Sequence, residues 1–332
     1  LIITHDLAVV AEIADKIVIM QNGQIVEAEK TEELLSNMKH PYTRALFNAS
    51  THRVVMPEAI SSETLLSVDS VVRTYTLPRN KILGSRPNFN ALDNVNFRIG
   101  HGERVGLVGE SGCGKSTLTR AILGVEDVQS GQITLDGESV FSGNKPNLDV
   151  RRKMQVVFQD PYSSFNPRHR VDRLIAEPLH VLENPPVGEL KDLAVLKALE
   201  DVGLMGSDAK KFIHEFSGGQ RQRIAIARAL IIEPELIIFD EAVSALDVSV
   251  RAQVLDLIAE LCHKRPLAYL FISHDLSVVR SVTDRVMIMR DGKIVEYGET
   301  EKVFTNPQNA YTKTLIAAAP RLPEATYAIE PV

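Results

Sequence analysis

A glycine-rich stretch in the first half of the chain has the residue types and spacing of a phosphate-binding loop. It fits the pattern G-x-x-x-x-G-K-[ST], which begins at Gly109 and ends at Lys115 and Ser116. The glycines let the backbone approach a phosphate without a Cβ in the way. The lysine supplies a positive charge for β- and γ-phosphates, and the serine hydroxyl can bind Mg²⁺. The residues expected at a bound nucleotide are Gly109, Glu110, Ser111, Gly112, Cys113, Gly114, Lys115, Ser116 and Thr117.

The segments on both sides of this loop indicate how the chain positions it. Arg104–Val108 is short and apolar, as a buried strand is, and Ser116–Leu123 is typical of the first turns of a helix. A strand, a loop and a helix in this order direct backbone N–H groups and a helix N-terminus at one point, which attracts an anion. The alternative is a Gly/Ser-rich turn that fits the pattern by chance, and the flanking elements argue against it.

Two adjacent carboxylates follow another apolar segment. Leu236–Phe239 is expected to be a buried strand, and it leads into Asp240 and Glu241. Beside a phosphate loop, Asp240 can hold Mg²⁺ directly or through water, and Glu241 can polarise an attacking water. Taken alone, the pair could equally be a solvated turn, so the catalytic interpretation depends on the phosphate loop.

A second candidate anion site precedes the expected helix Arg221–Ile231. It consists of Ser217, Gly218, Gly219 and Gln220, a serine and two glycines at a helix start. One nucleotide does not need two such sites from one domain, so this site becomes useful when it faces the γ-phosphate held by another copy. A simple N-cap with flexible glycines is the alternative.

Two polar side chains follow further expected strands. Gln159 comes after Gln155–Phe158 and could reach Mg²⁺ and water while its loop faces a partner. His274 comes after Tyr269–Ile272 and could donate a hydrogen bond to a γ-phosphate oxygen. A loop glutamine and a surface histidine are the ordinary alternatives, and a matching His5 in a repeated segment weakens the second of them.

The repeated segment occurs once at each end of the sequence. Leu1–Val10 matches Leu270–Val279, and the match continues without a gap to residue 50. Two copies this far apart indicate two tandem copies of a large domain, the first present only as its C-terminal end. A local duplication of one supersecondary unit is the alternative. We refer to residues 1–50 as the first copy and to the matching residues, from Leu270 onward, as the second copy.

The repeat leads to expectations about the N-terminal residues. Leu1–Thr4 and Lys16–Met20 are expected strands that would normally be buried against strands that the first copy does not contain. Exposed apolar strand edges favour association. We therefore expect the chain to be a fragment of a longer two-domain protein, and the second domain to fold without residues 1–60.

Composition narrows the functional classes. The chain has 332 residues, a formal net charge of −6 and a pI of about 5.9, so a general affinity for nucleic acid is not expected. No apolar run approaches the roughly 18–20 residues of a membrane span. The two cysteines, Cys113 and Cys262, have no neighbours at metal-ligand spacing, which favours a reduced cytoplasmic setting.

The order of elements predicts the fold class. Strands alternate with helices through most of the chain, which favours an α/β fold with a mostly parallel sheet. Val95–Ile99 is an expected strand, and 171–215 is expected to be mostly helical. Pro78, Gly84 and Pro87 mark an irregular excursion before Val95.

Together these residues resemble the nucleotide-binding domain of ATP-binding-cassette (ABC) proteins. The resemblance rests on a Walker A loop at 109–117, a Q-loop at Gln159, the signature Ser217–Gln220, the Walker B acids Asp240 and Glu241, a D-loop ending at Asp247 and the switch residue His274. It implies a P-loop NTPase fold with a mostly parallel sheet, an antiparallel β subdomain and a helical subdomain. It divides the chain into a remnant of a first domain at 1–50, a linker at 51–64 and a complete second domain at 65–332 with a C-terminal extension.

The resemblance also implies residue roles. ATP and Mg²⁺ are held by Lys115, Ser116, Asp240 and Gln159, and Tyr75 stacks on adenine. Ser217, Gly218, Gly219, Gln220 and Asp247 act at the nucleotide of the other domain in a head-to-tail pair. Glu241 is the catalytic base, and His274 and Gln159 support catalysis.

Within the family, the sequence is similar to the oligopeptide, dipeptide and nickel importer branch. The similar segments are Phe158–Pro167, Glu241–Asp247 and the tails with Pro41-Tyr42-Thr43 and Ala310-Tyr311-Thr312. Tandem copies resemble the fused members, among them glutathione importer ATP-binding proteins. Many members bind an iron–sulfur cluster through cysteines after the tail motif; the chain has none there, so no cluster is expected.

The branch implies an ATPase that powers solute uptake from the cytoplasmic face of the inner membrane. Its partners are permease membrane subunits, a separate solute-binding protein and a second nucleotide-binding domain. A soluble tandem-cassette ATPase acting on ribosomes or DNA is the alternative from another class. A non-catalytic interaction module is a third, and the intact Lys115 and Glu241 argue against it.

Overall fold

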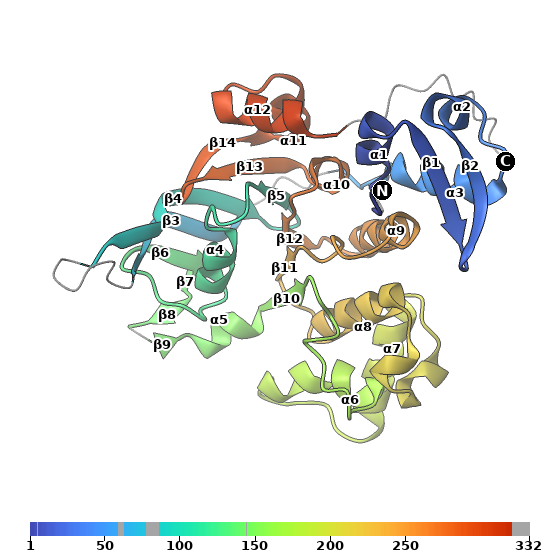
Figure 1. Ribbon diagram of the computed structural model, residues 1–332. Helices are drawn as coiled ribbons and strands as arrows, with labels where there is room; N and C mark the ends of the chain where they lie inside the picture. The colour runs from blue at the N-terminus through green and yellow to red at the C-terminus, as the bar shows by residue number, and fades with distance from the viewer. Residues whose placement is uncertain (5, 59–62, 78–85, 144, 321–332) are drawn as a thin grey trace.

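The computed structural model describes residues 1–4, 6–58, 63–77, 86–143 and 145–320. Figure 1 shows a large α/β unit, with the N-terminal segment lying at one side of it next to α9. His5 and residues 78–85 of the predicted excursion lie outside the described residues. Within the described part of the chain, no helix combines the length and the apolar character that crossing a bilayer requires.

The centre of the large unit is a six-stranded sheet with the strand order β10-β11-β12-β5-β13-β14. Each neighbouring pair is parallel except β13 with β14, which confirms the predicted mostly parallel α/β sheet. The strands β5 and β12 are buried at every residue, which explains their largely apolar sequences. The bounds are β5 (Arg104–Val108), β10 (Met154–Phe158), β11 (Leu236–Asp240), β12 (Ala268–Ile272), β13 (Arg285–Arg290) and β14 (Lys293–Glu299).

The register of the parallel strands determines which loops meet. Phe158 pairs with Asp240, Asp240 with Ile272, and Ile272 with Leu107. These four residues stand at or next to the carboxyl ends of their strands. The loops that follow them therefore share one edge of the sheet, where open α/β sheets bind their ligands.

A second, antiparallel sheet covers the helix that follows the phosphate loop. Leu118 and Ile122 of that helix, α4, pack in one buried cluster with Val68 of the antiparallel sheet and Leu107 of the parallel one. The antiparallel sheet has the order β4-β3-β6-β7 and confirms the predicted β subdomain. The bounds are β3 (Thr64–Thr76), β4 (Asn88–Gly100), α4 (Lys115–Ile122), β6 (Ser130–Leu135) and β7 (Glu138–Ser139), followed by a small pair β8 (Phe141–Ser142) and β9 (Lys145–Pro146) and by α5 (Leu148–Arg152).

Helices form a separate group between β10 and β11, as the mostly helical segment 171–215 predicted (Figure 1). Leu199 and Ile224 of this group share a buried cluster with Phe239 of the parallel sheet. The bounds are α6 (Val171–Ile175), the 3₁₀ helix η1 (Glu177–Val181), α7 (Glu189–Asp201), η2 (Gly206–Lys210), η3 (Ile213–Glu215) and α8 (Gly218–Leu230). The remaining helices are α9 (Val248–Lys264), α10 (Leu276–Val282), α11 (Thr300–Thr305) and α12 (Ala310–Ala318).

The N-terminal segment has a small core of its own. Its strands pair only with each other, and Leu7, Ile17, Leu34 and Phe47 form a buried cluster beneath them. Its elements are α1 (Leu7–Ile13), β1 (Lys16–Gln21), β2 (Gln24–Lys30), α2 (Thr31–Ser36) and α3 (Pro41–Ser50).

The strand predicted at Leu1–Thr4 is wrong. These residues are exposed and form no strand among the described residues. The matching segment of the second copy is β12, which lies between β11 and β5. A strand needs such neighbours to satisfy its backbone N–H and C=O groups, and the first copy contains no counterpart of β11 or β5.

The residues after α3 lie against the large unit. α3 packs on α9, and His52 Nε2 lies 2.6 Å from Asp256 Oδ1. Val54 and Met56 pack against the largest buried cluster, and the Arg104 guanidinium donates to the Pro57 carbonyl at 2.7 Å. The first part of the predicted linker, up to Pro57, therefore lies against the surface of the large unit.

Candidate nucleotide site

The phosphate loop lies between β5 and α4, as predicted. Gly114 begins α4 with φ of 117°, and a Cβ there would lie 2.3 Å from the Ala91 carbonyl oxygen. Only glycine fits this position without strain. The loop folds around the Lys115 ammonium, which donates to the carbonyl oxygens of Gly109 at 2.7 Å and Glu110 at 2.9 Å.

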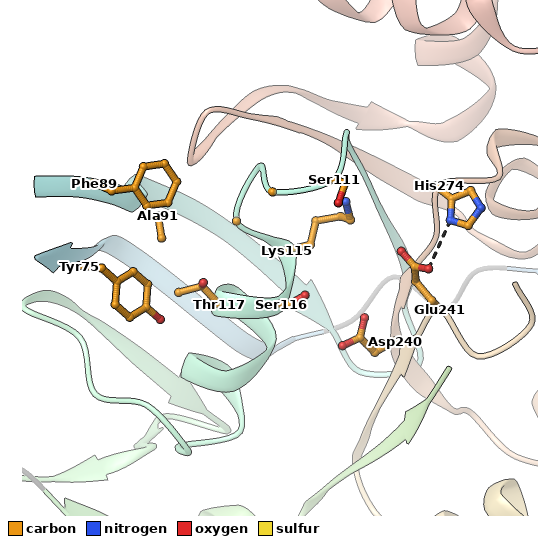
Figure 2. A pocket seen from close by; sticks show the side chains of 12 residues that line it. Tyr75, Phe89, Ala91, Ser111, Lys115, Ser116, Thr117, Asp240, Glu241 and His274 are labelled. Atoms are coloured by element: carbon orange, nitrogen blue, oxygen red, sulfur yellow. Dashed lines mark ion pairs between the residues drawn. The ribbon is translucent and has the colours of Figure 1, made fainter. Parts of the chain in front are cut away.

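A cavity of about 460 Å³ opens beside this loop. Figure 2 shows its side chains converging from the antiparallel sheet, the phosphate loop and the ends of β11 and β12. Phe89 and Ala91 belong to it in addition to the predicted residues. The lining consists of Tyr75, Phe89, Ala91, Ser111, Gly112, Gly114, Lys115, Ser116, Thr117, Asp240, Glu241 and His274.

Asp240 and Glu241 at the end of β11 and His274 after β12 line the same part of the cavity. Glu241 has the left-handed φ of 52°, which is uncommon for a residue with a side chain, and its N–H donates to the Ile272 carbonyl at 2.9 Å. This backbone turn positions Glu241 Oε2 at 3.3 Å from His274 Nδ1, as the dashed line in Figure 2 marks. A carboxylate beside an imidazole can accept a proton and have its orientation fixed by the ring.

Asp240 is partly buried beside this pair. Burial, followed by the neighbouring Glu241 charge, raises the pKa of its carboxyl group, whereas Lys115 and Arg120 act in the opposite direction. A divalent cation bound to this carboxylate would offset the cost of burying its negative charge and would reduce its repulsion from Glu241. The Ser116 hydroxyl lines the same cavity, so oxygen ligands of the kind that Mg²⁺ prefers are available together.

Two aromatic side chains line the far end of the cavity. Tyr75 pairs with Phe89 across β3 and β4, and its hydroxyl donates to the Glu126 carboxylate. The Arg73 guanidinium lies 5.0 Å from the Tyr75 ring centroid. The sequence analysis missed Phe89, which is 46% exposed and offers a second flat apolar surface. The signal that could have found it is an aromatic opposite Tyr75 on an expected hairpin.

Nine of the predicted residues are not part of the cavity lining. Gln159 follows Phe158, the register partner of Asp240, and is exposed at the same sheet edge. Gly109, Glu110 and Cys113 belong to the phosphate loop but not to the lining, and a Cβ at Gly109 would lie 2.3 Å from the Met289 carbonyl oxygen. The others lie on α8 and α9, namely Ser217 with its neighbours to Gln220, and Asp247.

The signature segment is a helix start, as both interpretations predicted. Ser217 Oγ accepts the Gln220 N–H at 3.4 Å, and Gln220 Oε1 accepts the Ser217 N–H at 3.1 Å, which is a capping box. Gly219 lies so close to α9 that a Cβ would be 2.2 Å from Val250 Cγ1. Asp247 caps α9 in a similar way, by accepting the Val250 N–H at 3.1 Å. Ser217 and Gly218 remain exposed.

Known proteins are similar to this chain in sequence and in structure. Residues 92–244 match the family described as ABC transporter. Residues 26–58 and 295–331 match the C-terminal region of oligopeptide/dipeptide transporters, so this region occurs in both copies. A dimeric ATP-binding cassette in a post-hydrolysis state with ADP and Pi is 27% identical, with a TM-score of 0.61, and the match covers 71% of this chain and 99% of that one.

The chain therefore contains an ABC transporter family domain at residues 92–244, and this domain carries most of the site. Within the family, it is similar to ATP-binding proteins of importers. It is 41% identical to a peptidoglycan transport ATP-binding protein of Agrobacterium fabrum, covering 96% of this chain and 58% of that protein. It is also 41% identical to the glutathione import ATP-binding protein of Escherichia coli K12, covering 96% and 55%. The chain thus spans little more than half the length of these relatives.

Proposed function

We propose that the chain is part of the ATP-binding and ATP-hydrolysing component of an ABC importer for peptides or a related small solute. One observation supports this most strongly. A single cavity brings together the phosphate-loop lysine, Lys115, with the acids Asp240 and Glu241 and with His274. The relatives named above are import and transport ATP-binding proteins, which favours uptake as the process that ATP drives.

ATP is the substrate that this cavity fits. Its triphosphate would lie along the phosphate loop, near Lys115, and its adenine would face Tyr75 and Phe89 at the other end. Ser116, Asp240 and Gln159 would hold Mg²⁺, which when bound neutralises phosphate charge. Glu241 would accept a proton from the attacking water, oriented by His274 at 3.3 Å.

The exposed signature segment is proposed to act on a second nucleotide. Ser217 and Gly218 stand at the N-terminus of α8 on the surface, where a helix start attracts anions. In a head-to-tail pair, these residues and Asp247 would face the ATP of another nucleotide-binding domain. That domain would be fused upstream or belong to another chain.

The remaining partners follow from the same proposal. The chain would lie peripherally at the cytoplasmic face of the inner membrane, where permease subunits would receive the motion of the Gln159 loop. A separate solute-binding protein would deliver the solute. The solute would be selected by the solute-binding protein and the membrane subunits, and not by this domain. None of the relatives named above is described as acting on ribosomes or DNA, so we do not propose that alternative.

Substitution of the proposed base tests this function. In the full-length assembled transporter, Glu241→Gln should keep MgATP binding and lower hydrolysis at least about 10²-fold, as the loss of a positioned base does. The measurement is phosphate release with any other ATP site silenced, with binding followed by calorimetry. Near-wild-type turnover at this site would remove Glu241 from the role.

A further inference from the structure

A tyrosine of the C-terminal extension contacts the phosphate loop. Tyr311 stands in the first turn of α12 and is largely buried. Its hydroxyl oxygen accepts the backbone N–H of Glu110 at 3.4 Å. The two residues are far apart in sequence, and Tyr311 is not part of the cavity lining, so it contacts the loop from the side away from the substrate.

The contacted peptide group also binds the phosphate-loop lysine, Lys115. The N–H of Glu110 and the C=O of Gly109 belong to one planar peptide, on which the two groups point in opposite directions. The carbonyl oxygen accepts from the Lys115 ammonium at 2.7 Å, while the N–H donates to Tyr311. The hydroxyl on one side and the ammonium on the other thus fix the rotation of the same peptide.

The tyrosine is itself held in place by its surroundings. The Arg290 guanidinium lies 4.7 Å from its ring centroid, at the end of β13. Asn309 caps α12 by accepting the Tyr311 N–H at 2.8 Å. The Glu296 carboxylate accepts the N–H groups of Gln308 at 2.7 Å and Asn309 at 3.1 Å, so the start of α12 is fixed to β14.

The phenol stays protonated under ordinary conditions. Burial raises the pKa of Tyr311, and the nearby Glu110 charge adds to this, although the hydrogen bond from the Glu110 N–H acts in the opposite direction. A neutral hydroxyl accepts the N–H without placing a negative charge beside the triphosphate.

We propose that Tyr311 is a positioning residue for the phosphate loop, acting through the Gly109–Glu110 peptide on Lys115. The C-terminal extension, which is matched to oligopeptide/dipeptide transporters, would thereby stabilise the ATP-binding form of the loop. This inference rests on the proposed function, because it concerns the affinity of the same site for ATP.

The test compares two tyrosine-to-phenylalanine variants of the full chain. Tyr311→Phe removes the hydroxyl and keeps the ring, and it should weaken MgATP binding about 2- to 5-fold, the effect of one long hydrogen bond. Tyr297→Phe is the control, because that hydroxyl donates at 2.7 Å to the Arg98 carbonyl, away from the cavity. Calorimetry with MgATP and with adenosine should show the Tyr311→Phe loss for MgATP only.

The outcomes separate this inference from its alternatives. Equal losses for MgATP and adenosine, or a lower melting temperature without nucleotide than the control variant, would mean that Tyr311 merely supports the fold. Unchanged MgATP affinity in Tyr311→Phe would also overturn the inference. If the unsubstituted chain binds no MgATP at all, the proposed function fails instead.

Discussion

The two copies of the repeated segment form the same hairpin in different surroundings. β1 and β2 in the first copy correspond to β13 and β14 in the second. Both turns use two residues with positive φ, Asn22 with Gly23 and Asp291 with Gly292. Both hairpins also have a register shift at the same place, between residues 19 and 20 and between residues 288 and 289.

The attachment of the following helix is repeated as well. Glu27 accepts the N–H groups of residues 39 and 40, just as Glu296 accepts those of residues 308 and 309. In each carboxyl group, burial alone would raise the pKa, but hydrogen bonds outweigh it and lower the pKa. The local chain chemistry is thus sufficient to form this unit twice.

Burial is where the copies differ. Val18 and Met20 of β1 are 46% and 57% exposed, whereas the matching Met287 and Met289 of β13 are 0% exposed. β13 pairs with β5 and its methionines pack in the cluster that contains α4, while β1 pairs only with β2. The same two apolar positions are therefore buried in the second copy and exposed in the first, because burial depends on the neighbouring elements.

The helices that end the copies also meet different partners. α12 of the second copy brings Tyr311 to the phosphate loop of its own domain. α3 of the first copy packs on α9 of the second domain instead. Tyr42, which corresponds to Tyr311, packs against the small N-terminal cluster.

Charging matching methionines gives the largest expected difference between the copies. Met289→Asp buries an unpaired carboxylate in the core and should lower the free energy of unfolding by about 3–5 kcal/mol. Met20→Asp lies on the surface and should change it by less than about 0.5 kcal/mol. Urea unfolding of the full chain measures both. Equal destabilisation would show that β1 is covered by another surface in solution.

A smaller difference is expected from substituting Glu296 and Glu27, which are the corresponding glutamates of the two copies. Glu296→Gln should lower the stability of the second domain by about 1 kcal/mol at pH 7, through weaker hydrogen bonds to an uncharged acceptor. The folded-state pKa of Glu296 is below its ordinary 4.5, so its contribution is present above that pH and is lost as the pH falls through the folded value.

Stability measured against pH checks this sign. The unsubstituted chain should lose more stability below about pH 4.5 than Glu296→Gln does, because the variant has no such carboxylate to protonate. Glu27→Gln is the matched variant, and its effect should be confined to unfolding of the N-terminal segment. A Glu27→Gln effect on the second domain would contradict the separation of the two copies.

Much of the site could be predicted from the sequence because it is local. The phosphate loop follows directly from β5, and Asp240 and Glu241 follow from the buried β11, so strand order alone brings them to one edge. His274 follows β12 in the same way. The parallel register then makes the strand ends meet, which a pattern of alternating elements already implies.

Other features depend on contacts that no local pattern records. Phe89 joins the site because β4 pairs with β3 in one particular register, after the intervening residues 78–85. Tyr311 reaches Glu110 only through the folded C-terminal extension. Leu1–Thr4 has the sequence of a strand but lacks neighbours to pair with. In each case tertiary structure, and not propensity, decided the outcome.

Our central proposal is that the second domain is a complete nucleotide-binding unit to which the first copy is attached. The direct test removes residues 1–52, which keeps the Val54–Pro57 segment that packs on the second domain. Melting of this shortened chain and of the full chain is compared with and without MgATP. At about 100 times its Kd, MgATP should stabilise both by about 2.7 kcal/mol, if only the native state binds. A shortened chain that fails to fold, or that loses this stabilisation, would show that the first copy belongs to the second domain's core.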